Sequence, residues 1–267
     1  MSVSSLFSLQ AKVGVVVGGA RDLGFDIASV LAEAGADLVI TSRTLASAEQ
    51  AAMTLRERHG VKVLALALDH RRHAEVAVVV DQAQAWQGHI DILVNNAGGG
   101  AGKGKSHLFE RSPAEVEDLI ATNLTGALHC CQAVARIMAK QGSGKIINIA
   151  SVAGLLGRDR RVYAKNKMGG QSIDYAAAKA GVIGMTRDLA GLLSPMGIHV
   201  NCISPGGFAR AGMPQGFIED YSDRTPLGRM GRDGVDLKGA ALFLASPASD
   251  YVTGHNLVVD GGFSLWR

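Results

Sequence analysis

Hydrophobic and polar residues follow two different patterns along the chain. Short runs of β-branched and apolar residues predict buried strands, and longer segments with apolar residues at helical spacing predict helices. The expected strands cover residues 13–17, 37–41, 61–68, 91–94, 145–149, 198–203 and 257–259. The expected helices cover residues 25–34, 45–58, 74–87 and 113–140, and a last one begins at Tyr175.

Strands that alternate with helices of this length predict parallel pairing through right-handed crossovers. We therefore expect an α/β fold, a three-layer Rossmann-type sandwich around a doubly wound parallel sheet. No linker rich in proline, glycine or serine divides the 267 residues, so the chain is interpreted as a single domain, 1–267.

Polar motifs directly follow most of the predicted strands. Ligands of such sheets bind beyond the carboxyl ends of the strands, so these motifs are expected to meet in one site. They are residues 18–24, Ser42 and Arg43, Asp69 and His70, residues 95–98, Ser151 and residues 204–206. Their coincidence at one edge of the sheet indicates a nucleotide site.

The first motif, residues 18–24 (GGARDLG), joins a predicted strand to a predicted helix. Glycines allow the backbone to approach a pyrophosphate, and a helix N-terminus supplies free N–H groups and a positive dipole. The spacing differs from the Gly-x-Gly-x-x-Gly pattern of long-chain dehydrogenases, so an ordinary tight turn is the alternative interpretation.

Tyr175 and Lys179 begin the last long helix and lie four residues apart, on one helical face. An ammonium group beside a phenol favours the phenolate, so we expect Lys179 to lower the pKa of Tyr175. The phenol could then act as a proton donor and acceptor near neutral pH. Most such pairs in proteins are surface pairs, so the interpretation depends on the other motifs.

Composition excludes several other classes of function. The net charge of +3 is small and dispersed, which argues against nucleic-acid binding. No run of about 18 apolar residues predicts a membrane span, and the first ten residues do not resemble a secretory signal. The three cysteines and eight histidines match no disulfide framework or metal-ligand spacing, so we expect a cytoplasmic protein without a metal site.

Taken in order, these motifs resemble the short-chain dehydrogenase/reductase family over essentially the whole chain. The matching pieces are residues 18–24, Asp69, residues 95–98 (NNAG), Asn123, Ser151, Tyr175 and Lys179, Asn201, Pro205 and Gly206, and residues 251–262. Residues 225–232 (TPLGRMGR) and 237–240 look most like gluconate 5-dehydrogenases and 3-oxoacyl-carrier-protein reductases.

The resemblance implies a catalytic set of Asn123, Ser151, Tyr175 and Lys179. Tyr175 would exchange a proton with the substrate oxygen, and Ser151 would hydrogen-bond that oxygen. Lys179 would hold the nicotinamide ribose, and Asn123 would hold a water that links Lys179 to solvent. The implied cofactor-binding residues are Gly18, Ala20, Arg21, Asp22, Leu23, Ser42, Arg43, Asp69, His70, Asn96, Ala97, Gly98, Tyr175, Lys179, Pro205 and Gly206.

The end of the second strand favours NADP(H) over NAD(H). NAD-selective sites usually place a carboxylate there, on the ribose 2′-hydroxyl, whereas this chain has Ser42 and Arg43. Arg21 in the glycine turn supplies a second guanidinium, a group whose geometry suits a phosphate. The alternative is that Arg43 only stacks on the adenine.

Two positions depart from the family pattern around the cofactor. Asp22 replaces a glycine of the turn, where a carboxylate would repel a pyrophosphate unless it caps the helix and faces away, as we expect. After Gly206, residues 208–210 (FAR) replace a threonine that the family often uses to contact the carboxamide, so that contact is in doubt.

The largest departure is the separation of Ser151 from Tyr175, which is 24 residues and about twice the usual distance. Tyr163 and Lys167 form a competing pair at the ordinary spacing, but Gly169 and Gly170 leave Lys167 without a continuing helix. We therefore assign Tyr175 and Lys179 and interpret residues 158–171 as an insertion. Residues 208–225 are interpreted as a substrate lid, with a short helix at 213–221.

Cations in the insertion suggest two interpretations. Arg158, Arg160, Arg161, Lys165 and Lys167, with Lys103 and Lys105 on another loop, could form a positive rim that attracts an anionic substrate. They could equally belong to a solvated loop.

We expect an NADP(H)-dependent oxidoreductase that interconverts a ketone and a secondary alcohol, on a sugar-acid type of small-molecule substrate. The alternative substrate is a 3-oxoacyl thioester on a carrier protein, and the alternative class is a non-catalytic NADP-binding sensor or scaffold. The resemblance also implies a homotetramer built through the long helices near 123–140 and 175–193 and the C-terminal strand.

Overall fold

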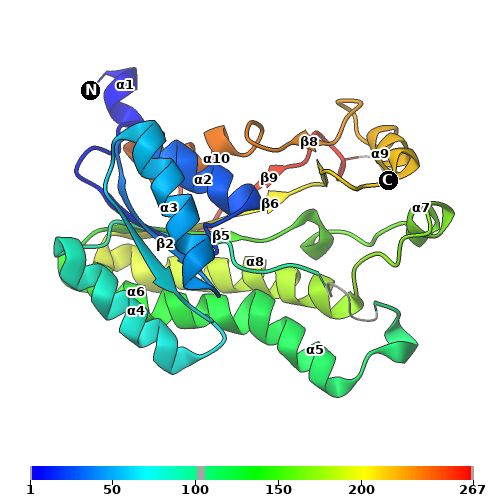
Figure 1. Ribbon diagram of the computed structural model, residues 1–267, viewed down its shortest axis with the longest axis horizontal. Coiled ribbons are helices and arrows are strands. Elements are labelled where there is room, and N and C mark those ends of the chain that lie inside the picture. Colours follow the sequence, from blue (N-terminus) through cyan, green and yellow to red (C-terminus); the bar gives the residue numbers. More distant parts are fainter. Residues whose placement is uncertain (1, 101–105, 266–267) are drawn as a thin grey trace.

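The computed structural model describes residues 2–100 and 106–265 (Figure 1). Seven strands pair in the order β3-β2-β1-β4-β5-β6-β9, and every neighbouring pair is parallel. The strands are β1 (Val13–Val17), β2 (Asp37–Ser42), β3 (Val63–Ala67), β4 (Ile92–Asn95), β5 (Gly144–Ile149), β6 (Ile198–Pro205) and β9 (Asn256–Val259). The predicted doubly wound parallel sheet is confirmed.

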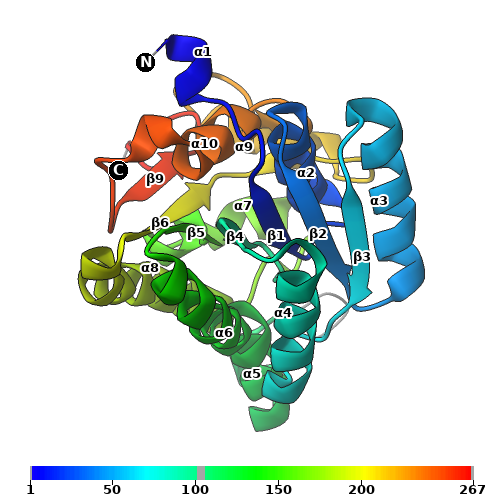
Figure 2. The same cartoon turned by 90° about the vertical axis from the view of Figure 1, so that its left-hand side faces the viewer.

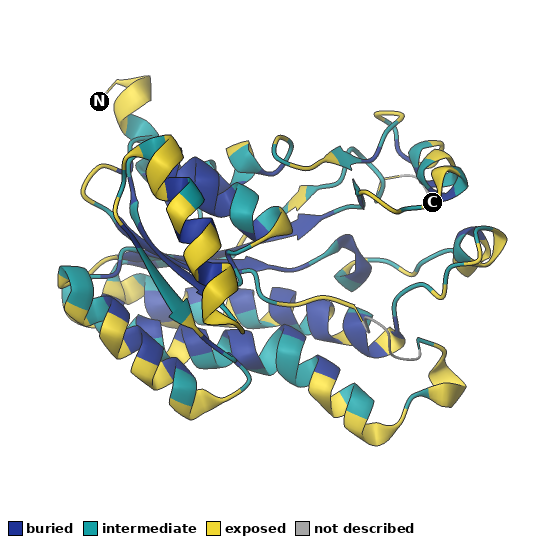
Figure 3. Cartoon of the chain, in the orientation of Figure 1, coloured by how far each residue is buried: buried dark blue, intermediate teal, exposed yellow. Residues whose placement is uncertain are grey.

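Helices cover both faces of the sheet (Figure 2). One layer contains α2 (Asp22–Glu33), α3 (Leu45–His59) and α10 (Lys238–Ala245), and the other contains α4 (His73–Gln87), α6 (Gly126–Gln141) and α8 (Ile173–Leu193). The two apolar cores lie between the sheet and each layer. Figure 3 shows the corresponding burial, with the central strands dark and the outer helical faces exposed.

Local sequence explains where several helices begin and end. Gly60, Gly88 and Gly142 adopt left-handed conformations directly after α3, α4 and α6, as expected for glycine C-caps. The helix α5 (Pro113–Ile120) begins with a capping box between Ser112 and Glu115. These caps fix the ends of the helices that support the sheet.

The structure differs from the sequence prediction in three places. The helix expected over residues 113–140 is divided by a π-helical turn, η2 (Ala121–Thr125), between α5 and α6. The helices α1 (Val3–Leu6), α7 (Arg160–Lys165) and α10 were not predicted, nor were the short strands β7 (Phe208–Ala209) and β8 (Gly231–Arg232). Within the described residues, 3-10 turns occur at η1 (Leu108–Glu110), η3 (Val152–Gly154), η4 (Ser194–Met196) and η5 (Pro247–Ser249).

Two short helices project beyond the carboxyl ends of the strands, α7 (Arg160–Lys165) and α9 (Gln215–Ser222) (Figure 1). Their aromatic rings meet, with the centroids of Tyr163 and Phe217 5.1 Å apart. The carboxylate of Asp220 also accepts hydrogen bonds from Lys165 at 2.7 Å and Asn166 at 2.7 Å. The insertion and the segment expected to be a lid therefore pack against each other.

Candidate active site

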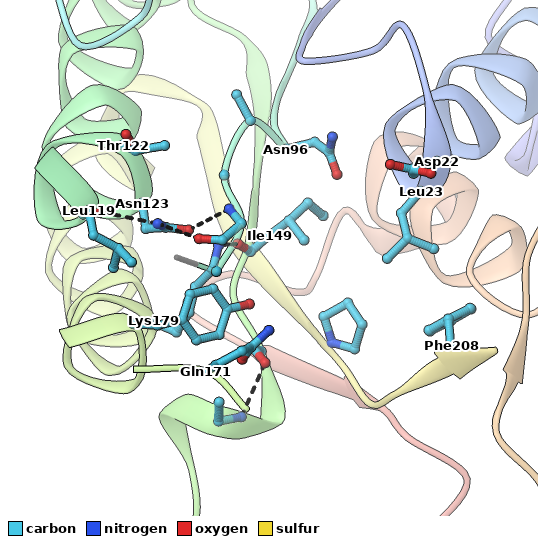
Figure 4. Close-up of a pocket in the computed structure, with 18 of the residues that line it drawn as sticks. Asp22, Leu23, Asn96, Leu119, Thr122, Asn123, Ile149, Gln171, Lys179 and Phe208 are labelled. Carbon is cyan, nitrogen blue, oxygen red and sulfur yellow. Dashed lines mark hydrogen bonds between the residues drawn. The ribbon is translucent and has the colours of Figure 1, made fainter. Parts of the chain in front are cut away.

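A large cavity of about 1650 Å³ opens at the carboxyl ends of the central strands. In Figure 4, Asp22, Leu23 and Phe208 lie on one side of it, and Asn123, Lys179 and Gln171 lie on the other. Every residue predicted from the sequence to be catalytic or to bind the cofactor lines this cavity. The structure therefore brings the motifs together, while the role of each residue stays a prediction.

Two glycines of the turn, Gly18 and Gly24, have no room for a side chain. A Cβ atom on Gly24 would lie 2.2 Å from the carbonyl oxygen of Gly18 and 2.4 Å from Nδ2 of Asn96. Gly18 has a φ of +74°, and its Cβ would lie 2.8 Å from Cα of Ala97. Asn96 also donates to the Gly18 carbonyl at 2.9 Å, which locks the turn onto residues 95–98. The turn leaves the N-terminus of α2 open to the cavity, as a pyrophosphate site requires.

The position and contacts of the Asp22 side chain differ from the prediction. It is the first residue of α2, makes no capping hydrogen bond and has a φ of +50°, a conformation that aspartate tolerates better than most residues. It lines the cavity, and its carboxylate lies 3.5 Å from a guanidinium nitrogen of Arg210. The prediction of a helix-capping residue facing away is wrong, because an arginine across the cavity supplies the compensating charge.

The adenosine end of the predicted site carries exposed arginines. Arg43 is exposed, the side chain of Arg21 is 82% exposed, and no carboxylate in the described part of the chain pairs with Arg43. Asp69 is different, because the Arg71 guanidinium donates to both of its oxygens and lowers its pKa to about 2. His70 is buried and donates to the Thr122 carbonyl at 2.8 Å.

Ser151 and Tyr175 converge where β5 ends and α8 begins. The Ser151 hydroxyl oxygen accepts a hydrogen bond from the Ala153 backbone at 3.1 Å, so its hydrogen can still be donated to a ligand. Lys179, one helical turn beyond Tyr175, donates to the Ile149 carbonyl at 2.8 Å. Its ammonium lies 5.7 Å from the centre of the Tyr175 ring.

The pKa of Tyr175 is the second property that differs from the sequence prediction. Burial raises the pKa of Tyr175, and the smaller opposing effects come from Ser151, Arg158 and Gln171 rather than from Lys179. Burial also lowers the pKa of Lys179 to about 8. The net lowering of the Tyr175 pKa that the sequence predicted is not found, because the loss of hydration of the buried phenolate outweighs the neighbouring positive charges. The phenol is therefore a group that holds its proton.

Asn123 lies in the π-helical turn, a type of irregularity often found at functional sites. Its side-chain oxygen accepts from the Gly99 backbone at 2.9 Å, and its nitrogen donates to the carbonyls of Gly99 and Leu119. A Cβ on Gly98 would lie 2.7 Å from Oδ1 of Asn123 and 3.3 Å from Nζ of Lys179. Asn123 and Lys179 thus face the same glycine.

The competing pair is not held together. Tyr163 belongs to α7, which ends at Lys165, and Lys167 is exposed in a left-handed conformation outside that helix. Tyr163 instead packs on Phe217 of α9. This geometry agrees with the choice of Tyr175 and Lys179.

Sequence reasoning missed several residues around the site. Gln171 contributes to the electrostatics of Tyr175, and Arg210 contacts Asp22. Arg111 forms a buried ion pair with Asp174, which anchors α8 one residue before the tyrosine. Arg210 stood at a recognised departure from the family, but no sequence signal connected it to Asp22.

Two other kinds of site are not found within the described residues. No group of histidine, cysteine and acidic side chains there could hold a metal ion. No helix there is long and apolar enough to cross a membrane.

The cavity, its glycine turn and the serine, tyrosine and lysine beside it define a nucleotide-dependent oxidoreductase of the short-chain type. The family model described as enoyl-(acyl carrier protein) reductase matches residues 18–264. The chain belongs to the short-chain dehydrogenase/reductase family.

Among its relatives, a 3-oxoacyl-acyl-carrier-protein reductase from Chlamydia muridarum is 38% identical, covering 95% of this chain and 97% of its own. A 5-keto-D-gluconate 5-reductase from Escherichia coli is 37% identical, covering 97% and 98%. The crystal structure of a gluconate 5-dehydrogenase from Burkholderia cenocepacia, in complex with NADP and tartrate, has a TM-score of 0.89. It is 35% identical and covers all of both chains.

Proposed function

We propose that this protein is an NADP(H)-dependent oxidoreductase that interconverts a ketone and a secondary alcohol on a sugar-acid type of substrate. The observation that carries the proposal is the convergence of Ser151, Tyr175 and Lys179 at the edge of the glycine-lined cavity. NADPH, when bound, would supply the hydride, and the residues of the chain would supply orientation and the proton.

The catalytic residues have distinct tasks in this proposal. Tyr175 gives its proton to the carbonyl oxygen, and its raised pKa keeps that proton in place until negative charge develops on the substrate. The Ser151 hydroxyl donates to the same oxygen. Lys179 holds the ribose hydroxyls, and Asn123 fixes the backbone of Gly99 beside them.

Preference for NADP(H) is supported by Arg21 and Arg43, whose exposed side chains at the cavity rim can contact a 2′-phosphate, although Arg21 also lies 3.8 Å from the carboxylate of Asp22. A guanidinium donates two coplanar hydrogen bonds to a phosphate and is attracted by its negative charge. The neutral ribose 2′-hydroxyl of NAD(H) carries no such charge. The relative crystallised with NADP supports the same preference.

The sugar-acid substrate is supported by the 5-keto-D-gluconate 5-reductase and the gluconate 5-dehydrogenase among the relatives. A 3-oxoacyl thioester is the second candidate, favoured by the reductase from Chlamydia muridarum at 38% identity.

The proposal also includes a lid formed by residues 208–225, a cytoplasmic location and a homotetramer. Exposed apolar side chains at the end of α8 and on β9, Leu192 and Val258, suit such an assembly.

The test is NADPH oxidation with 5-ketogluconate and an acetoacetyl thioester measured side by side. We expect turnover of 5-ketogluconate and little of the thioester. Turnover of the thioester alone would replace the sugar acid by the second candidate. If NADPH binds but neither substrate is turned over, the proposed substrate class is contradicted.

A further inference from the structure

The five cations of the insertion differ sharply in their surroundings. Arg161 is bound by Asp159 through two hydrogen bonds, and Lys165 is bound by Asp220. Arg160 donates to a backbone carbonyl at the surface, and Lys167 is exposed. Of the five, only Arg158 lines the cavity. Lys103 and Lys105, the other members of the expected rim, lie outside the described residues.

Arg158 reaches toward the catalytic tyrosine. Its guanidinium carbon lies 5.9 Å from the centre of the Tyr175 ring. One of its terminal nitrogens donates to Oε1 of Gln171 at 2.8 Å, and the other donates to the Ser172 carbonyl at 3.1 Å. Both acceptors are neutral, and they hold the guanidinium in one orientation.

The charge of Arg158 is not balanced by a carboxylate. No acidic side chain in the described part of the chain lies within ion-pair distance of it, although carboxylates pair with most other arginines near the cavity. A half-buried cation without an anion is unfavourable, because the loss of hydration is not repaid by an opposite charge. Five N–H donors are available on a guanidinium, and its neutral partners Gln171, Ser172 and Tyr163 leave donors for an anion.

We propose that Arg158 is the residue that binds the carboxylate of the substrate and thereby selects keto acids over neutral ketones. The proposal rests on the proposed function and names its specificity residue. A guanidinium binds a carboxylate through two parallel hydrogen bonds, which fixes the orientation of the substrate as well as its charge.

The position of Arg158 also separates the two substrate candidates. A group bound beside the Tyr175 ring must lie within a few bonds of the carbonyl that receives the proton. The carboxylate of a short keto acid meets this condition. The phosphate of a carrier-protein thioester does not, because its long arm places the phosphate many bonds from the reacting carbonyl.

The test compares two six-carbon substrates, 5-ketogluconate and L-sorbose, which has the same stereocentres but a primary alcohol in place of the carboxylate. Charge-assisted hydrogen bonds are the stronger class, so Arg158→Gln should lower kcat/KM for 5-ketogluconate roughly ten- to a hundredfold, mostly through KM. L-Sorbose reduction should change less than about threefold. Arg158→Lys should recover only part of the loss, because lysine keeps the charge without the paired donors.

Two controls keep the outcomes distinct. Arg161→Gln removes an insertion cation outside the cavity and should leave kcat/KM for 5-ketogluconate unchanged. The Kd of NADPH, measured by fluorescence, should be the same in wild type and Arg158→Gln. Equal losses on 5-ketogluconate and L-sorbose, or no loss on either, would overturn the proposal.

Calorimetric binding of gluconate to the enzyme with NADP separates this inference from the proposed reaction. Binding by wild type but not by Arg158→Gln supports the carboxylate site even if 5-ketogluconate is not reduced, in which case only the proposed reaction fails. Equal binding by both proteins overturns the role of Arg158 alone. Absence of gluconate binding and of 5-ketogluconate reduction in wild type overturns both.

Discussion

The cavity has two halves, which we propose bind the cofactor and the substrate and name accordingly, and they are built in different ways. The cofactor half is shaped by backbone, with Gly18 and Gly24 so close to neighbouring atoms that no side chain fits. The substrate half is shaped by side chains of α7 and α9, which meet through Tyr163 and Phe217 and through Lys165 and Asp220, 55 residues apart. A site made of backbone is visible as glycines in the sequence, whereas a site made of side-chain pairs requires the fold.

The largest effect is expected when positive charge is removed from the cofactor half. In the double variant Arg21→Ala with Arg43→Ala, each lost phosphate contact should cost about 1.5–3 kcal/mol, so NADPH should bind roughly a hundredfold or more weakly. NADH has no 2′-phosphate and should bind about as before. Fluorescence titration of both cofactors measures this, with Lys62→Ala as a control at an exposed distant cation. Equal weakening of both cofactors would rule out a phosphate role.

Steric change in the same half should have the next largest effect. Gly24→Ala forces a methyl group against the Gly18 carbonyl, and such overpacking costs about 1–3 kcal/mol. NADPH binding should weaken by roughly ten- to a hundredfold. Gly239→Ala in α10 is the matched control, because its Cβ would meet nothing within 4 Å. A Gly24→Ala protein with wild-type NADPH affinity would contradict the close packing of the turn.

The stability of the folded protein should depend on pH through Lys179, at the boundary between the halves. Burial lowers its pKa to about 8 from the ordinary 10.5, so between these values the unfolded chain binds more protons than the folded protein. The free energy of unfolding should therefore rise with pH across this window, by up to about 1.4 kcal/mol per pH unit. Urea unfolding of wild type and Lys179→Met at several pH values measures the difference. Parallel pH profiles for the two proteins would contradict a depressed pKa.

The contact between Asp22 and Arg210 should give the smallest effect. Asp22→Asn removes a negative charge from the turn but keeps a side chain that tolerates the positive φ, so NADPH should bind more tightly. Arg210→Gln should weaken NADPH binding in the wild-type background but change it little in the Asp22→Asn background, so the double variant should bind NADPH like Asp22→Asn. The coupling energy from this cycle should be no more than about 1 kcal/mol, because both side chains are partly exposed. Strictly additive effects would show that the two residues act separately.

Much of the fold followed from the sequence, because the buried strands are strongly apolar and the glycine motifs mark their ends. The positions of Tyr175 and Lys179 followed from helical spacing and from the glycines after Tyr163. The π-helical turn at Asn123 was missed because helical spacing and propensity do not distinguish a single π turn from the α-helices on either side of it. The Asp22 contact and the surroundings of Arg158 were also missed, because each depends on residues that only the fold brings together.

The pair of tyrosines provides the most direct test of the central claim, that Tyr175 is the proton donor at the boundary of the two halves. NADPH-dependent turnover and NADPH binding should be measured in Tyr175→Phe and Tyr163→Phe side by side. We expect Tyr175→Phe to lose roughly 10²–10⁴-fold in kcat with NADPH still bound, as for the loss of a general acid. Tyr163→Phe should retain turnover. Retained turnover in Tyr175→Phe, with loss in Tyr163→Phe, would contradict the assignment.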